Sequence, residues 1–161
     1  MSKTGIIFPH QLVEQSTLVS TCDTIYLVEE WLYFKQFNFH KQKIAFHRAS
    51  MKFYESYLLS KNIQVVYIDS HREISDIREL IRHLNSIGIE ELEYIDTTDY
   101  LLQLRLEKAC KRNSIRLNKH QSSLFLNTPD EIDSYFSERK RMFQTDFYKN
   151  QRLSRNILLE D

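Results

Sequence analysis

Short segments rich in β-branched and aromatic residues alternate along this chain with longer segments of helical periodicity. The apolar segments have the length of buried strands, and the stretches between them are long enough for helices. Alternation of this kind favours βαβ units, in which successive strands lie parallel in one sheet. The predicted strands are 5–8, 24–28, 63–68 and 92–95, with 115–117 as a fifth, and the predicted helices are 39–61, 74–87 and 98–113.

We therefore expect an α/β fold, a Rossmann-like open sheet of four to five mainly parallel strands with helices on both faces. The only glycines, Gly5 and Gly88, are too few and too far apart for a glycine-rich dinucleotide-binding or phosphate-binding loop. A ligand would therefore have to be held by side chains and helix N-termini.

Length, charge and cysteine usage narrow the class of protein further. The chain has 161 residues, enough for one domain with a buried core, and its 22 basic residues balance 22 acidic ones. No global field therefore attracts nucleic acid or an acidic membrane. The sequence shows neither an apolar signal region nor a run long enough to span a bilayer, so we expect a cytoplasmic protein. Cys22 and Cys110 lack metal-binding or disulfide spacing, which indicates structural thiols and no metal site.

Polar residues follow two of the predicted strands directly. Glu29 and Glu30 come after strand 24–28, and His10 and Gln11 come after the first strand. Because the carboxyl ends of parallel strands meet at one edge of a sheet, we expect these side chains at the crevice where open α/β sheets bind ligands. Adjacent strand residues point to opposite faces, so the two glutamates are not expected to form a carboxylate dyad. We assign no catalytic residue.

The predicted helix 39–61 places basic residues on its apolar side. His40, Lys43 and His47 fall inside the apolar arc of a helical wheel, a conflict with binary patterning that marks function or strain. A buried lysine needs a partner, which would be one of the two strand-end glutamates or a bound acidic or polar ligand. Otherwise Lys43 extends its amine to solvent and His47 is an ordinary core histidine. The arc itself contains Ile44, Phe46, Met51, Phe53, Tyr54, Tyr57 and Leu58.

The last part of the chain has a different composition. Thr128-Pro129 predicts a helix start. From Ser137 onwards, basic residues alternate with aromatic ones, and a short charge run of this kind is usually a solvated face although it could contact DNA phosphates. We therefore divide the chain into an α/β domain, 1–137, and a basic, aromatic tail, 138–161.

Four motifs stand out along the chain: Phe8-Pro-His-Gln-Leu12, Val28-Glu-Glu30, Phe39-His-Lys-Gln-Lys43 and His47-Arg-Ala-Ser-Met-Lys52. Together they resemble the deoxyribodipyrimidine photolyase-related proteins, the bacterial iron–sulfur branch of the cryptochrome/photolyase family. A weaker likeness continues through Asp99-Tyr100 and 147–152, so the resemblance covers nearly the whole chain. It implies the amino-terminal, Rossmann-like antenna domain of a light-driven DNA-repair lyase or a photoreceptor.

The resemblance also implies a chromophore and its site. Relatives with a characterised antenna hold a ribityl lumazine, and some of them carry Gly-Asp where this chain has Pro9-His10. By position, the residues around that pocket would be Gln11, Glu30, His40, Lys41 and Lys43, and the residue patterns above add His10, Glu29 and His47 to the candidate cofactor-binding set.

In the resembled family, the FAD, the iron–sulfur cluster and most DNA contacts belong to a helical carboxyl-terminal half. We expect this chain to lack that half and to have no photorepair activity by itself. Its tail would pack on the missing half or on a second copy, and DNA would be bound only in the full-length context. Two other functions stay open: a separate nucleotide-binding α/β enzyme that uses His40 and Lys43 on phosphate, and a partner-docking module.

Overall fold

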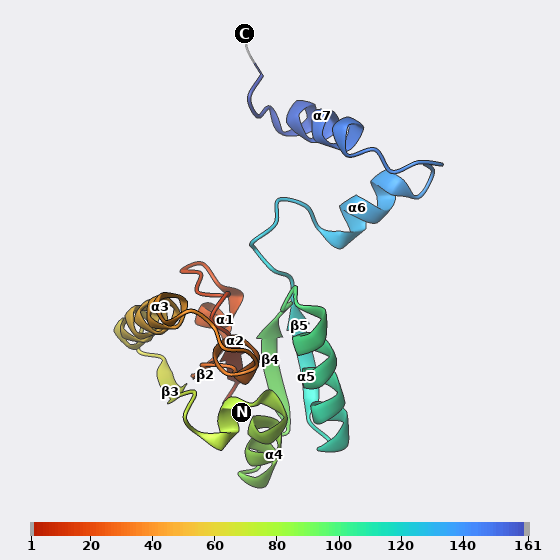
Figure 1. Ribbon diagram of the computed structural model, residues 1–161. Helices are drawn as coiled ribbons and strands as arrows, with labels where there is room; N and C mark the ends of the chain where they lie inside the picture. The colour runs from red at the N-terminus through yellow and green to blue at the C-terminus, as the bar shows by residue number, and fades with distance from the viewer. Residues whose placement is uncertain (1, 160–161) are drawn as a thin grey trace. The chain divides into compact units, whose positions relative to one another are not determined.

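The computed structural model describes residues 2–159. Its centre is one sheet of five strands, all parallel, in the order β3-β2-β1-β4-β5 (Figure 1). The predicted Rossmann-like α/β fold is therefore confirmed, including the fifth strand. The strands are β1 (Thr4–Ile7), β2 (Thr24–Val28), β3 (Gln64–Ile68), β4 (Glu91–Ile95) and β5 (Arg116–His120).

Helices connect each strand to the next. The three predicted helices are present, and two short helices, at 17–21 and 31–34, are not among those predicted. A 3₁₀ turn, η1 (Glu73–Ser75), precedes α4. The helices are α1 (Thr17–Thr21), α2 (Trp31–Phe34), α3 (Lys41–Ser60), α4 (Ile77–Ser86), α5 (Tyr100–Arg112), α6 (Pro129–Phe136) and α7 (Gln144–Arg155).

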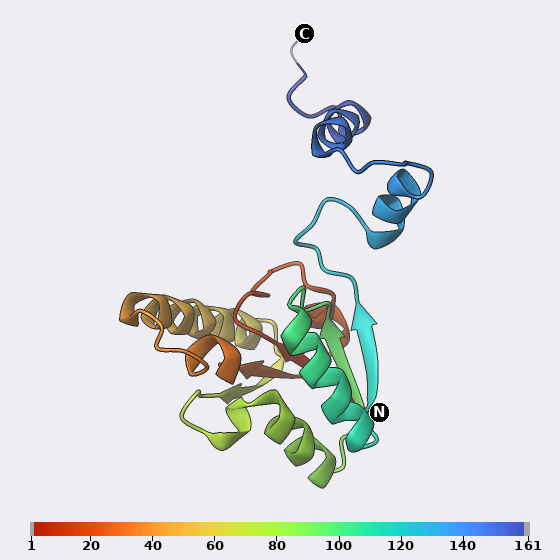
Figure 2. The same ribbon diagram turned by 45° about the vertical axis from the view of Figure 1, so that its right-hand side comes forward.

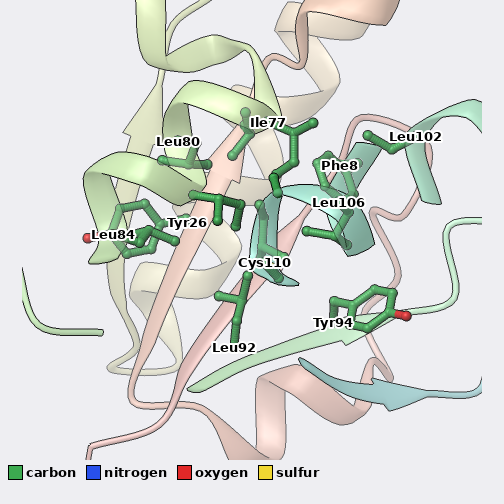
Figure 3. Packing of buried hydrophobic residues seen from close by; sticks show 14 of the residues in the cluster. Phe8, Tyr26, Ile77, Leu80, Leu84, Leu92, Tyr94, Leu102, Leu106 and Cys110 are labelled. Atoms are coloured by element: carbon green, nitrogen blue, oxygen red, sulfur yellow. The ribbon is translucent and has the colours of Figure 1, made fainter. Parts of the chain in front are cut away.

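The helices between strands cover both faces of the sheet. Side chains alternate along each strand, so Ile6 packs with α4 and α5 on one face whereas Ile7 packs with α1 and α3 on the other. Figure 3 shows the first of these cores, in which Phe8 lies beside Leu106 and Leu92 lies near Cys110. A fully buried side chain of this size contributes roughly 1.5–3 kcal/mol relative to an exposed one.

Capping residues fix where the helices beside the carboxyl edge of the sheet begin and end. Asp76 accepts a hydrogen bond from Arg78 N at 2.9 Å to start α4, and Asp99 accepts one from Leu102 N at 3.0 Å to start α5. Gly88 follows α4 with a φ of 84°, a conformation that residues with a Cβ rarely adopt. Asp99 therefore caps the start of α5, and Gly88 allows the chain to turn after α4.

The two cysteines are buried in different cores. Cys22 packs on the α1 and α3 side of the sheet, and its Sγ lies 2.9 Å from where a Cβ on Gly5 would be. Cys110 packs on the α4 and α5 side, where burial raises the pKa of its thiol to about 12. Both side chains are therefore structural in this fold, as expected.

The chain divides into two compact units between Ser123 and Leu124. In the second unit, Thr128 Oγ1 accepts a hydrogen bond from Glu131 N at 3.2 Å, and Glu131 Oε2 accepts one from Thr128 N at 2.8 Å. This capping box starts α6 where the sequence predicts a helix start. The predicted division after residue 137 falls in the connection between α6 and α7 and stays a prediction. Among residues 2–159, no helix has the length and apolar character needed to cross a bilayer.

Candidate ligand-binding site

The order of the strands reverses at β1, which has β2 on one side and β4 on the other. In open α/β sheets the crevice at such a reversal, beyond the carboxyl ends of the strands, is the usual place for a ligand. The arrowheads of β4 and β5 in Figure 2 point toward this edge. The residues predicted as a site lie at this edge or at the start of α3 and along it. They differ in how many hydrogen bonds their side chains form with the rest of the protein.

Glu29, at the end of β2, is fully buried and fully partnered. Arg48 of α3 donates from Nε to Oε1 at 2.7 Å and from Nη2 to Oε2 at 2.5 Å. Tyr67 donates its hydroxyl to Oε1 at 2.6 Å, and Ser70 donates its backbone N–H to Oε2 at 2.9 Å. Burial by itself would raise the pKa of Glu29, but these hydrogen bonds outweigh it and lower the pKa to about 2. Glu29 therefore locks β2, β3 and α3 together as a carboxylate.

Glu30 points to the other face, as the alternation of a strand predicts. Its carboxyl group accepts hydrogen bonds from Leu32 N at the start of α2 and from Ile77 N, 3.3 Å away, at the start of α4. Burial raises the pKa of Glu30 to about 7, although both backbone hydrogen bonds act in the opposite direction. Its side chain is fully buried and ties two helix starts to the end of β2.

Gln11 joins the ends of β1 and β4 across the reversal. Its side-chain oxygen accepts from Phe8 N at 3.3 Å, and its amide nitrogen donates to Ile95 O at 3.1 Å and Asp96 O at 3.2 Å. Gln11 is buried, so these bonds satisfy backbone groups that would otherwise be orphaned. The sequence correctly places Gln11 at this edge, and its polar atoms are used by the protein.

His10 lies at the same reversal but is only partly satisfied. Its Nε2 lies 2.7 Å from Thr97 O, and because a carbonyl oxygen only accepts, Nε2 must carry the proton. Burial lowers the pKa of His10, which keeps the ring neutral, so Nδ1 is a bare acceptor. Nδ1 is buried and has no hydrogen-bond partner among residues 2–159.

Two aromatic rings contact the His10 ring. Phe8 stacks on the His10 ring at a centroid distance of 6.4 Å and an interplanar angle of 9°, and Tyr33 lies 5.2 Å away at a tilt of 59°. Tyr33 donates its hydroxyl to Asp99 Oδ2 at 3.2 Å, which fixes that ring at the start of α5. His10 Nδ1 is therefore an acceptor without a hydrogen bond on a ring that packs against two other aromatic rings.

The first turns of α3 carry the basic residues of the predicted site. His40 caps the helix, its Nδ1 accepting from Gln42 N at 3.2 Å, and Lys41 is exposed at the first helical position. Lys43 is exposed too, with Nζ 3.9 Å from the centroid of the Phe39 ring. These three residues lie on the outer side of the helix start.

His47 is half-buried one turn further along α3. Its ring centroid lies 6.2 Å from that of Phe34, and burial lowers its pKa, with the electrostatic interactions with Lys43 and His10 acting in the same direction. His10, Lys43 and His47 are therefore close enough to interact electrostatically. The structure brings these three predicted site residues into one neighbourhood.

The predicted apolar arc of α3 is wrong in part. Met51, Tyr54 and Leu58 are buried, but Phe46 and Phe53 are 72% and 77% exposed. At 100° per residue, both phenylalanines lie on the side opposite Met51, so the buried stripe is narrower than predicted. Lys43 lies outside this stripe.

The sequence does not predict the residue that forms an ion pair with Glu29. Arg48, which is not among the predicted site residues, pairs with Glu29, and Lys43 makes no ion pair in the described part of the chain. Arg48 lies inside the motif 47–52 that carries the family resemblance, which was the available signal. Nothing in the local sequence indicated the contributions of Tyr67 and Ser70.

This sheet and its edge define a doubly wound α/β domain with a candidate ligand site at the strand reversal. The family model described as deoxyribodipyrimidine photo-lyase-related protein matches residues 5–161, so the chain belongs to that family. A similar protein, the uncharacterized protein R852 of Acanthamoeba polyphaga mimivirus, is 30% identical over 171 aligned positions, which cover 99% of this chain and 86% of the relative. The predicted family membership is confirmed.

Proposed function

We propose that this chain is the antenna-chromophore-binding domain of a photolyase-related protein, and that the chromophore is a ribityl lumazine or a close relative of it. The binding place is the carboxyl edge of the sheet between β1 and β4. Membership of the family supports the class of ligand. The unpaired Nδ1 of His10 at the strand reversal is the observation that carries the site.

The chemistry of His10 selects the ligand group that it would bind. A neutral ring protonated on Nε2 offers a lone pair at Nδ1, so the ligand must supply an N–H or O–H donor. A lumazine has a ring N–H, and its ribityl chain has hydroxyl groups. A buried acceptor without a partner costs roughly 1–3 kcal/mol, and a ligand donor would remove that cost. Tyr33, which is partly exposed beside His10, offers a ring face against which a flat heterocycle packs, and the fully buried Phe8 supports the His10 ring from the core side.

The basic residues of α3 supply the polar side of the proposed site. Lys43 and His47 lie near His10 and can donate hydrogen bonds to the carbonyl oxygens of a lumazine. His40 and Lys41, at the start of the helix, form the rim. The other three predicted residues, Gln11, Glu29 and Glu30, hold the strand ends and helix starts in place through their own hydrogen bonds.

The proposed role includes no photorepair by this chain alone. Light-driven repair in the family uses an FAD, whose half of the protein we do not assign to this chain. Cys22 and Cys110 pack on opposite faces of the sheet, so they cannot ligate one iron–sulfur cluster together. The chain would collect light and pass the excitation to a flavin held elsewhere.

Titration of the chain with a ribityl lumazine, followed by fluorescence, tests the proposal. We expect saturable binding, and an affinity about tenfold lower for His10→Phe, which removes one hydrogen bond but keeps a flat ring. The matched control is His71→Phe, because the His71 side chain is 79% exposed and follows β3, the edge strand that β2 separates from β1. Absence of binding by the unaltered chain, or repair of a DNA lesion by the chain alone, would contradict the assignment.

The second compact unit supports a further part of the proposal, a docking surface. Its rings Tyr135, Phe136 and Phe147 pack together, with centroids 4.8–5.3 Å apart, but many of its apolar side chains are exposed. We propose that these side chains pack on the helical half of the protein or on a second copy. The exposed apolar residues are Leu124, Phe125, Leu126, Ile132, Met142, Phe143, Tyr148, Leu153, Ile157, Leu158 and Leu159.

Sedimentation velocity of the full chain and of a chain ending at Ser123 tests this surface. The first unit has its own two cores, so the shortened chain is expected to fold. We expect the full chain to self-associate at micromolar concentration and the shortened chain to stay monomeric. Two monomers, together with a second unit that resists proteolysis, would contradict the docking role.

A further inference from the structure

A groove between α4 and α5 concentrates positive charge on a chain whose net charge is zero. The two helices pack side by side on the same face of the sheet (Figure 1). The groove has a volume of about 260 Å³, and none of the described residues that line it is acidic. Its five cationic residues are Arg78, Arg82, Arg105, Lys108 and Arg112.

The spacing of these residues stacks like charges along each helix. Arg78 and Arg82 are four residues apart on α4, and Lys108 and Arg112 are four apart on α5. Like charges at this spacing destabilise a helix by a few tenths of a kcal/mol. The macrodipole favours cations in the last turn of α5, which accounts for Arg112 but not for Arg105, in the middle of the helix.

The two helices differ in how their cations are partnered. Arg78 pairs with Asp76 at 2.5 Å, and Arg82 pairs with Glu79. Lys108 and Arg112, by contrast, are exposed and form no ion pair within residues 2–159. The α5 side of the groove therefore has charge that an anion could use.

Arg105 provides an independent sign of a missing acceptor. Its Nη1 is buried and has no hydrogen-bond partner in the described chain, and its Nη2 reaches only Gln36 Oε1, at 3.5 Å. The positive charge of Arg105 acts to lower the pKa values of Glu30 and Asp76, but neither carboxyl group accepts a hydrogen bond from Arg105. A guanidinium cannot lose its charge, so a buried N–H of this kind stays unsatisfied until an acceptor arrives.

We propose that this groove binds a ligand with several phosphate groups, at a site separate from the carboxyl-edge chromophore site. Arginine forks match phosphate oxygens two at a time, and lysine adds a mobile point charge. From Arg105 to Arg112 the helix rises by about 10 Å, which is longer than one phosphate. A soluble oligophosphate and the backbone of a nucleic acid share this chemistry.

Calorimetric titration of the full chain at low salt, with tripolyphosphate and with a short single-stranded oligonucleotide, tests the proposal. The groove variant is Lys108→Gln with Arg112→Gln, and its charge-matched control is Lys61→Gln with Lys111→Gln. All four residues are exposed, and only the first two line the groove. Thermal melts of both variants confirm that they fold.

We expect the groove variant to lose about tenfold or more in affinity for whichever ligand binds, and the control to lose less than about twofold. Tighter binding of tripolyphosphate would identify a soluble oligophosphate as the ligand. Tighter binding of the oligonucleotide, with a salt dependence that weakens in the groove variant, would identify a nucleic-acid backbone. The proposal is overturned if neither ligand binds the unaltered chain, if the groove variant binds as tightly as the unaltered chain, or if the control loses as much affinity.

Discussion

Two stretches of the carboxyl edge of the sheet both have buried polar side chains, but they differ in how many of these polar atoms form hydrogen bonds. At the β2–β3 end, Glu29 accepts hydrogen bonds from Arg48, Tyr67 and Ser70, and its carboxylate is fully used. At the β1–β4 end, His10 makes one hydrogen bond and leaves Nδ1 buried without a partner.

The difference shows that opposite charges gathered at a strand end do not by themselves mark a binding site. The Glu29 cluster is built to hold β2, β3 and α3 in register, and a ligand would have to break existing bonds to enter it. The His10 neighbourhood gains a bond when a donor arrives. Unsatisfied hydrogen-bonding capacity, and not charge, therefore separates the candidate site from its scaffold.

The largest expected effect comes from breaking the saturated end. Arg48→Met leaves Glu29 buried without its cation, which should lower the free energy of unfolding by roughly 3 kcal/mol. Lumazine affinity, measured well below the melting temperature, should stay the same because Arg48 does not contact the proposed site. Urea denaturation measures the stability, with Lys61→Met, at the exposed residue directly after α3, as the control. A variant of normal stability that loses affinity would move the ligand site to Glu29.

The next effect concerns Glu30 and pH. Its pKa is about 7 in the folded chain and near 4.5 when unfolded, so the folded state binds the proton more tightly. This stabilisation is complete below about pH 4.5 and is lost as the pH rises through 7, a change on the order of 2–3 kcal/mol. Glu30→Gln keeps the acceptor oxygen but cannot titrate.

Urea denaturation at pH 5 and pH 8 compares the two proteins. From pH 5 to pH 8 the unaltered chain should lose stability relative to Glu30→Gln, whereas the lowered pKa values of His10 and His47 raise the stability of both proteins alike over this range. Glu29 titrates in the opposite sense at lower pH, because its pKa of about 2 lies below the unfolded value, and so does not disturb this window. Equal slopes in both proteins would assign the pH dependence to another group.

A matched pair of ring substitutions sharpens the contrast between the two ends. Tyr67→Phe removes a hydrogen bond to a buried carboxylate and should cost roughly 1–2 kcal/mol. His10→Phe loses the bond to Thr97 O but also removes the unpaired Nδ1, so its stability should change by less than about 1 kcal/mol. Thermal unfolding followed by circular dichroism compares the two. A larger loss for His10→Phe would mean that His10 is a scaffold residue like Glu29.

The smallest effect is expected at Lys43. Its amine lies over the Phe39 ring and is exposed, so Lys43→Met should change stability by less than about 0.5 kcal/mol. Lumazine affinity should fall by about threefold, since an exposed charge contributes little. Fluorescence titration of both proteins gives the ratio. An unchanged affinity would remove Lys43 from the proposed site.

Sequence periodicity predicts the fold of the first unit well because the central strands β1, β2 and β4 are largely buried and α4 and α5 begin at capping aspartates. The strand 24–28 and the start of α6 at Pro129 agree with the structure. The position of Gln11 at the edge follows from the same rule. Local patterns locate these elements because each depends on residues close in sequence.

The candidate site was harder to predict because its character depends on partners far apart in the chain. Arg48 is separated from Glu29 by 19 residues, and Tyr67 by 38. The protonation of His10 depends on Thr97, which is 87 residues away. A helical wheel shows only the side of the helix on which a residue lies. It could not show that the long side chain of Arg48 extends to Glu29, whereas that of Lys43 extends over the Phe39 ring.

The central claim is that His10 Nδ1 accepts a hydrogen bond from the ligand. It can be tested by ¹⁵N nuclear magnetic resonance of the histidine rings. In the free chain we predict the Nε2–H tautomer with a Nδ1 resonance typical of a bare ring nitrogen. Saturation with a ribityl lumazine should shift that Nδ1 resonance toward the hydrogen-bonded range and leave the exposed His71 unchanged. A proton on Nδ1 in the free chain, or a His10 spectrum that the ligand does not alter, would contradict the account.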